Sequence, residues 1–134
     1  MQLVLERCTI RQWRLDDAES LARHANNRKI WLAVRDLFPH PYTIQDAHEF
    51  LQRTISEGLA MKFCIEIDGV AVGGIGVHPG GRASAYSDNA EVFAKNPASA
   101  RVLEKAGFTF EGCLKNDVLK DGKLLDSLLY ARTT

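Results

Sequence analysis

The sequence predicts one α/β (α+β) domain, residues 1–134, in which short strands alternate with amphipathic helices. A helix with both ends marked lies between two strand-like segments, from Glu91 to Phe110. Asp68-Gly69 is a hairpin signal between two alternating segments, and further helical patterns precede it. A chain of 134 residues can bury a hydrophobic core without disulfides or a structural metal.

Composition and charge exclude several classes of protein. Seventeen basic and seventeen acidic residues cancel, and no charge run indicates a nucleic-acid or membrane partner. Cys8, Cys64 and Cys113 are odd in number and widely spaced, which fits a reducing cytoplasm and argues against a zinc site. Cys64 and Cys113 are expected to be small core residues rather than nucleophiles. The four histidines show no metal-ligand spacing, and neither a secretory signal nor a membrane span is expected.

The first part of the chain predicts a strand followed by a helix. Cys8 to Leu15 alternates as a strand, and Asp16–Glu19 forms a D-x-x-E capping box. Apolar residues at helical spacing then predict an amphipathic helix to about Asn26-Asn27. A second, short helical segment is expected over Ile30–Leu37.

A stiff aromatic loop leads into the longest helix predicted. The two prolines of Phe38-Pro39-His40-Pro41-Tyr42 exclude helix there, because each pushes the preceding residue towards extended geometry. Thr43-Ile44-Gln45-Asp46 then opens a helix that Gly58 ends.

The centre of the chain predicts a β-hairpin. Leu59 to Ile67 and Val70 to Val77 are the two strands, joined by the Asp68-Gly69 turn. The apolar phase changes midway along the second strand. Because a one-residue slip exchanges the two faces of a strand, we expect a β-bulge near Gly73-Gly74.

The late helix is the most clearly marked element. Asn96 can cap its first turn, Pro97 suits the first helical position, and Gly107 can end it in a left-handed conformation. An apolar stripe is expected to face the core; its members are Ala98, Val102 and Ala106, with Leu103 beside them.

Strand-like segments surround this helix. Glu91–Ala94 precedes it and Phe108–Leu114 follows, so the helix is expected to cross between two neighbouring strands. The closing strand is expected over Leu124–Ala131, after the turn-like Lys120-Asp121-Gly122.

Asn96-Pro97-Ala98-Ser99 running into Glu104–Phe108 resembles the late helix of the GNAT superfamily of N-acyltransferases, in the branch of the ribosomal-protein-alanine N-acetyltransferases. The strand, two helices and F-P-H-P-Y-T loop of the amino-terminal half resemble the same family. The resemblance covers about residues 8–77 and 91–132. It implies a mixed, mostly antiparallel sheet flanked by helices, acetyl-CoA as cosubstrate, and transfer of an acetyl group to a primary amine, either a protein N-terminus or a small molecule.

The resemblance also implies roles for individual residues. Asn96 and Ser99 lie on the cofactor side, and Ser99 is the candidate acid for the departing thiolate. The other implied positions are Gly76 and Val77 for cofactor binding and Phe38, Tyr42 and Tyr86 for the acceptor groove. The structural alternatives are that Asn96 is only a cap, that Ser99 is only a first-turn residue and that the aromatic residues pack in the core. No general base is named; Glu111, Asp117 and Asp126 qualify by character alone.

The family's pyrophosphate-binding loop and its helix are missing, which gives an internal deletion around residues 78–90. These residues hold no Q/R-x-x-G-x-G/A motif and leave no room for the helix. The deletion is real, or a partner chain completes the fold as a homodimer, or the full polypeptide has a segment that this sequence omits. The expected function is therefore an N-acetyltransferase, impaired in CoA binding if the motif is truly missing; the alternative is a non-catalytic scaffold that self-associates or binds a partner. A nucleotide-binding module on Gly73–Gly81 is the weakest reading.

Overall fold

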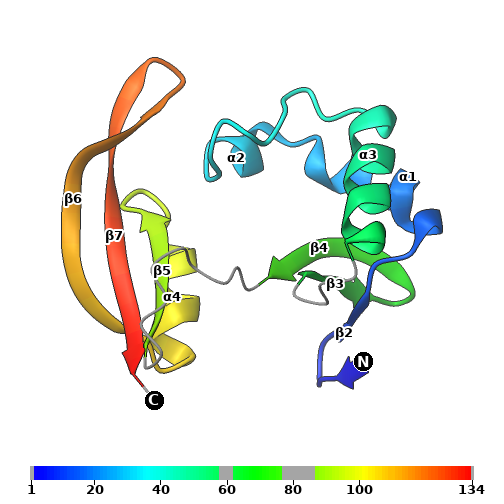
Figure 1. Ribbon diagram of the computed structural model, residues 1–134, viewed down its shortest axis with the longest axis horizontal. Helices are drawn as coiled ribbons and strands as arrows, with labels where there is room; N and C mark the ends of the chain where they lie inside the picture. Colours follow the sequence, from blue (N-terminus) through cyan, green and yellow to red (C-terminus); the bar gives the residue numbers. More distant parts are fainter. Residues whose placement is uncertain (1, 58–61, 77–86, 134) are drawn as a thin grey trace. The chain divides into compact units, whose positions relative to one another are not determined.

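The computed structural model describes residues 2–57, 62–76 and 87–133, and the chain forms two compact units (Figure 1). The first unit comprises residues 1–31 and 39–78, and the second comprises residues 32–38 and 79–134. The predictions for Gly58, Val77 and Tyr86 concern residues outside the described ranges.

The first unit has a four-stranded antiparallel sheet in the order β1-β2-β3-β4. Its strands are β1 (Gln2–Val4), β2 (Thr9–Gln12), β3 (Lys62–Ile67) and β4 (Val70–Gly76). The short, exposed β1 was not predicted, because three residues carry no periodic signal. The β3–β4 turn is as predicted, with Asp68 and Gly69 both at positive φ, 51° and 79°.

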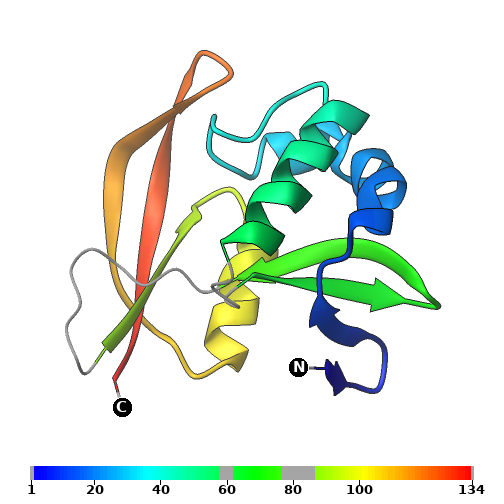
Figure 2. The same cartoon turned by 45° about the vertical axis from the view of Figure 1, so that its right-hand side comes forward.

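Helices cover this sheet on one side (Figure 2). The helices of this unit are the 3₁₀ helix η1 (Leu15–Asp17), α1 (Ala18–Ala25), α2 (Arg28–Trp31) and α3 (Ile44–Ser56), and α1 and α3 are the ones that lie over the sheet. α1 packs against α3 and β4. Leu51 and Ala47 of α3 are fully buried, and the rings of Trp13 and Phe50 meet edge to face at 5.6 Å. The helical segment expected over Ile30–Leu37 is wrong beyond Trp31.

One of the two predicted capping boxes is confirmed and the other is wrong. The Thr43 N–H donates to Asp46 Oδ2 at 2.8 Å, and the Asp46 N–H donates to Thr43 Oγ1 at 3.2 Å. At the start of α1, no side chain caps the helix. Asp17 rather than Asp16 occupies that position, and its carboxylate accepts instead from the guanidinium of Arg11 and the N–H of Arg14.

The predicted bulge in β4 is confirmed, one residue earlier than expected. Ile65 lies opposite Gly73 while Glu66 lies opposite Ala71, so Val72 is the extra residue.

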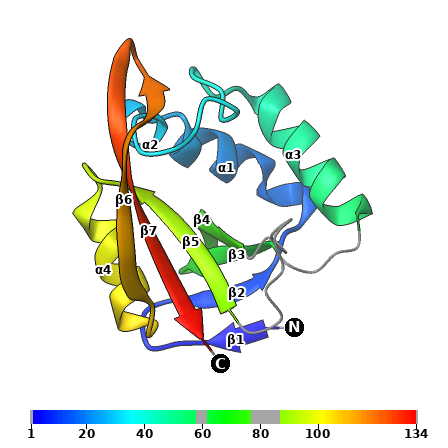
Figure 3. The same ribbon diagram turned by 60° about the vertical axis from the view of Figure 1, so that its left-hand side comes forward.

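The second unit has a three-stranded antiparallel sheet in the order β5-β7-β6 (Figure 3). The strands are β5 (Ser87–Phe93), β6 (Thr109–Lys120) and β7 (Lys123–Thr133), and α4 (Pro97–Lys105) joins β5 to β6. Both β5 and β6 run antiparallel to β7, so they are parallel to each other with β7 between them. The expectation that α4 joins neighbouring strands is therefore wrong, because the last strand of the chain inserts between them.

The ends of α4 are as predicted, whereas its buried face is not. Pro97 is the first helical residue and Gly107 follows the helix with a φ of 86°. Val102, placed in the predicted apolar stripe, is 61% exposed, whereas Ala100 is 8% exposed. The helix is rotated so that its half-buried side carries Asn96 and Ser99 with Ala100. Cys113 was also predicted to be a core residue, and it is exposed on β6.

Candidate functional site

The N-terminus of α4 brings the two predicted cofactor-side residues together. Asn96 Oδ1 accepts a hydrogen bond from the Ser99 N–H at 3.3 Å, which caps the helix. Asn96 Nδ2 donates to Ser99 Oγ at 2.9 Å. The cap fixes which end of the amide faces the helix, so the side-chain bond has one direction. Both side chains are half-buried.

This arrangement leaves the proton of the Ser99 hydroxyl available. The oxygen accepts from Asn96, and no described group accepts from the hydroxyl. A hydroxyl that accepts one bond and still has its proton to donate can act as a general acid. Asn96 also caps the helix, as the structural alternative expected. The two roles are compatible because Oδ1 of the amide makes the cap and Nδ2 holds the Ser99 oxygen.

Gly76, the other described cofactor-side residue, ends β4 and lies opposite Lys62. It is exposed. β4 is the last strand in its sheet, so one of its edges pairs with no strand in the described part of the chain. An exposed glycine at a free strand edge allows close approach of a ligand to the backbone.

The two described acceptor-side aromatics differ in burial. Phe38 is half-buried in the second unit, and its N–H donates to the Arg35 carbonyl at 3.0 Å. Tyr42 is 6% exposed in the first unit, and its N–H donates to Asn26 Oδ1 at 3.0 Å. Burial, reinforced by the charge of Asp46, raises the pKa of Tyr42, so the phenol stays protonated at neutral pH. Tyr42 therefore has the burial of a core residue.

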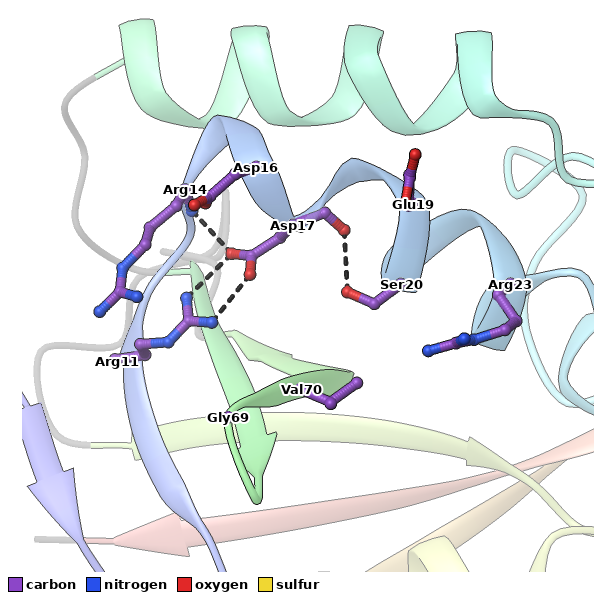
Figure 4. A pocket seen from close by; sticks show the side chains of 9 residues that line it. All are labelled: Arg11, Arg14, Asp16, Asp17, Glu19, Ser20, Arg23, Gly69 and Val70. Carbon is purple, nitrogen blue, oxygen red and sulfur yellow. Dashed lines mark hydrogen bonds and ion pairs between the residues drawn. The ribbon is translucent and has the colours of Figure 1, made fainter.

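An ion network that the sequence did not predict lies at the start of α1 (Figure 4). Arg11, 4% exposed, donates to both oxygens of Asp17 at 2.8 and 2.9 Å and also pairs with Glu66 of β3. Burial alone would raise the pKa of Asp17, but the hydrogen bonds from Arg11 and Arg14 outweigh it and lower the pKa. An arginine inside an alternating strand, just before two aspartates, is the only sequence signal for this network.

A polar hollow of about 250 Å³ lies beside this network (Figure 4). Three arginines and three carboxylates line it, with Ser20 and the β3–β4 turn; the charged residues are Arg11, Arg14, Arg23, Asp16, Asp17 and Glu19. The formal charges of these six side chains sum to zero, so the lining favours neither an anion nor a cation.

The candidate bases are scattered. Asp126 Oδ1 accepts from the Asn116 N–H at 2.8 Å, while Glu111 and Asp117 are exposed on β6. Within the described ranges, no group of three or more His, Cys, Asp or Glu residues could hold a metal ion, and no helix could span a membrane. Burial raises the pKa of Cys64 to about 11, so this fully buried thiol is neutral, as expected of a core residue.

Solved structures similar to this chain include several acetyltransferases. A GNAT-family acetyltransferase from Bacillus anthracis matches with a TM-score of 0.80 and 19% identity, over 99% of this chain and 98% of that one. RimL, a ribosomal L7/L12 α-N-protein acetyltransferase in complex with coenzyme A, matches with a TM-score of 0.77 and 17% identity. The match covers 98% of this chain and 96% of RimL. The ribosomal-protein-S5-alanine acetyltransferase from Vibrio fischeri matches with a TM-score of 0.77 and 16% identity, over 99% of this chain and 96% of that chain. No protein-family model and no curated protein matches the sequence significantly. At sequence identities of 16–19%, the likeness to these structures shows the fold of this chain and nothing finer.

Proposed function

The chain has the fold of the GNAT acetyltransferases, and from this premise we propose that it transfers an acetyl group from acetyl-CoA to a primary amine. The observation that carries this proposal is the hydrogen-bonded pair at the start of α4. Asn96 holds the Ser99 oxygen and leaves the hydroxyl proton free for a leaving group.

The proposed mechanism is direct attack. A neutral amine attacks the thioester carbonyl, the carbon–sulfur bond breaks, and the Ser99 hydroxyl gives its proton to the departing thiolate. The attacking nitrogen loses one proton to solvent, and solvent returns one proton to the Ser99 oxygen. Asn96 orients Ser99 in the second unit, and the exposed Gly76 of the first unit is a separate proposal for a backbone contact to the cofactor. Acetyl-CoA supplies the activated acyl group. Positioning accounts for much of the rate, and general acid–base help adds about 10²–10⁴-fold.

The proposed acceptor is a protein N-terminus or a small-molecule amine. The named activities of RimL and of the S5-alanine acetyltransferase, which modify ribosomal proteins, support the first. Phe38, Tyr42 and Tyr86 are proposed to contact the acceptor. Three free cysteines fit a reducing cytoplasm, and the balanced charge fits a partner that is neither nucleic acid nor membrane.

The fit to the pyrophosphate of CoA is poorer. Only ten residues, 77–86, separate β4 from β5, and they lie outside the described ranges. Ten residues are too few for both a phosphate-binding loop and a long helix whose N-terminus would hold the pyrophosphate. The short connection therefore favours impaired CoA binding. It also supports a second candidate function, a scaffold that self-associates as a homodimer through a free strand edge.

The two candidates differ in cofactor binding and turnover. Calorimetry with acetyl-CoA, together with mass spectrometry of a peptide with an N-terminal alanine or serine, separates them. The enzyme binds acetyl-CoA and yields acetylated peptide. A chain that neither binds the cofactor at millimolar concentration nor acetylates any amine is the scaffold, and its sedimentation then depends on protein concentration.

A further inference from the structure

The segment Leu32–Phe38, here called the strap, belongs to the second unit although its chain neighbours belong to the first. Two consecutive strap residues form ion pairs with the sheet. Arg35 pairs with Glu91 of β5, and Asp36 pairs with the Lys120 ammonium of β6 at 2.8 Å. The Lys120 side chain is 1% exposed, whereas the Asp36 side chain is 66% exposed, so a strap residue at the surface covers a buried ammonium.

Strand register shows where the strap crosses the sheet. Glu91 lies opposite Leu129 of β7, and Lys120 lies opposite Lys123 of β7. Because β7 is the central strand, a segment that reaches both outer strands must cross it between these two positions. Leu125 and Ser127 lie in that interval and share one face with Glu91 and Lys120, by the two-residue period of a strand.

Ser127 differs from the other residues on this face because its polar group is buried without a partner among the described residues. It is 1% exposed, and its Oγ has no hydrogen-bond partner in the described part of the chain. Its cross-strand neighbours are Phe93 and Leu114. A buried hydroxyl without a partner destabilises the folded protein, and such exceptions in native proteins call for a cause. An alanine would fill the same place in this apolar surrounding at no such cost.

We propose that the Ser127 hydroxyl binds the acceptor amine, in a site that the strap covers and uncovers. This rests on the proposed function and extends it to a residue that the family resemblance did not indicate. A hydroxyl can donate to the lone pair of a neutral amine or accept from its N–H, so it suits either state of a primary amine. The strap can open because both of its ion pairs reach solvent: the Arg35 and Glu91 side chains are 63% and 38% exposed, and the Asp36 side chain is 66% exposed. Ion pairs with exposed partners hold weakly.

The test is Ser127→Ala, with thermal unfolding and steady-state kinetics on a peptide with an N-terminal alanine. The proposal predicts an unchanged or higher Tm, a KM for the peptide raised tenfold or more, and an unchanged KM for acetyl-CoA. A residue that served only the fold would not raise one KM alone. The matched control is Thr54→Val in α3, which removes the other unpaired buried hydroxyl and leaves both KM values unchanged.

A binding measurement separates this proposal from the acetyltransferase function. The same peptide, titrated without acetyl-CoA into the ¹⁵N-labelled protein, is expected to shift the backbone amides of residues 35–38 and 125–129. If the unmodified protein transfers no acetyl group but these amides shift, the acetyltransferase function fails and the amine site stands. If transfer occurs, and Ser127→Ala leaves the peptide KM unchanged or the shifts lie elsewhere, the Ser127 proposal is overturned.

Discussion

At the residue scale, the pair Asn96–Ser99 combines an observed structural role with a proposed chemical one. The carbonyl end of the Asn96 amide caps α4, and its NH₂ end holds the Ser99 oxygen. The sequence identified Asn96 as a helix cap because a cap is a local pattern, and the family resemblance indicated Asn96 and Ser99 as cofactor-side residues. Sequence reasoning could not find Ser127, because nothing near a serine in an apolar strand reveals that its hydroxyl lacks a partner.

Replacing Ser99 by alanine is expected to lower kcat by about 10²-fold, the lower end of the usual contribution of a general acid. The free energy of unfolding should change little, since the Asn96 cap accepts from the backbone N–H of residue 99, which alanine keeps. Steady-state kinetics checks this. Ser56→Ala, at the end of α3, is the control and should keep full activity. Unchanged turnover in Ser99→Ala would remove the hydroxyl from the mechanism.

The network around Arg11 predicts a dependence of stability on pH. The pKa of Asp17 is lower in the folded than in the unfolded chain, so this carboxylate stabilises the fold above its unfolded pKa of about 4. That contribution is lost as the pH falls through the lower, folded value. Asp17→Asn should therefore destabilise the protein at pH 7, by about 3–5 kcal/mol, since it leaves the buried Arg11 with a weaker partner. Urea unfolding between pH 7 and pH 3 checks it: the difference between variant and parent should shrink towards pH 3, and a constant difference would contradict this account.

At the element scale, helix ends and turns were predicted well because short-range chemistry decides them. The Thr43–Asp46 box, the Asp68-Gly69 turn and the ends of α4 all depend on residues within a few positions of one another. The predicted Asp16–Glu19 capping box is wrong. The residue at the helix start is the neighbouring Asp17, and its carboxylate binds Arg11, which also pairs with the distant Glu66. Long-range contacts of this kind leave little trace in local sequence.

The C-terminal end of α4 offers a test of conformation alone. Gly107 has a φ of 86°, in the left-handed region, so Gly107→Ala should cost about 1–2 kcal/mol of unfolding free energy. The control is Gly112→Ala in β6, where φ is not in that region and a new methyl group would meet no atom within 4 Å. That variant should be neutral or slightly stabilising, since it restricts the unfolded chain. Equal urea midpoints for the two variants would contradict the conformational explanation.

The free edge of β6 is irregular. Its register with β7 shifts at Glu111 and again between Leu114 and Val118, where Asn116 has a φ of 51°. Bulges and charges on an edge strand oppose pairing with another chain. We therefore expect any homodimer to use another edge. Glu111→Val with Lys115→Val, which removes two charges from β6, should increase concentration-dependent association in sedimentation experiments. If these changes have no effect, the charges do not protect this edge.

At the scale of the whole molecule, the fold class was predictable and the strand order was not. The resemblance of residues 8–77 and 91–132 to one family implied the fold that the solved structures show. The insertion of β7 between β5 and β6 depends on pairing between strands far apart in the chain. The same limit applies to the strap, whose ion pairs join residues 56 and 84 positions apart.

The central claim is that the start of α4 receives the acyl carrier. Titration of acetyl-CoA into the ¹⁵N-labelled full chain tests it most directly, through the backbone amides of Asn96 and Ser99. The account predicts that both amides shift saturably, and that Ser99→Ala leaves binding in place while slowing transfer. Amides at 96 and 99 that stay fixed up to millimolar acetyl-CoA would contradict it.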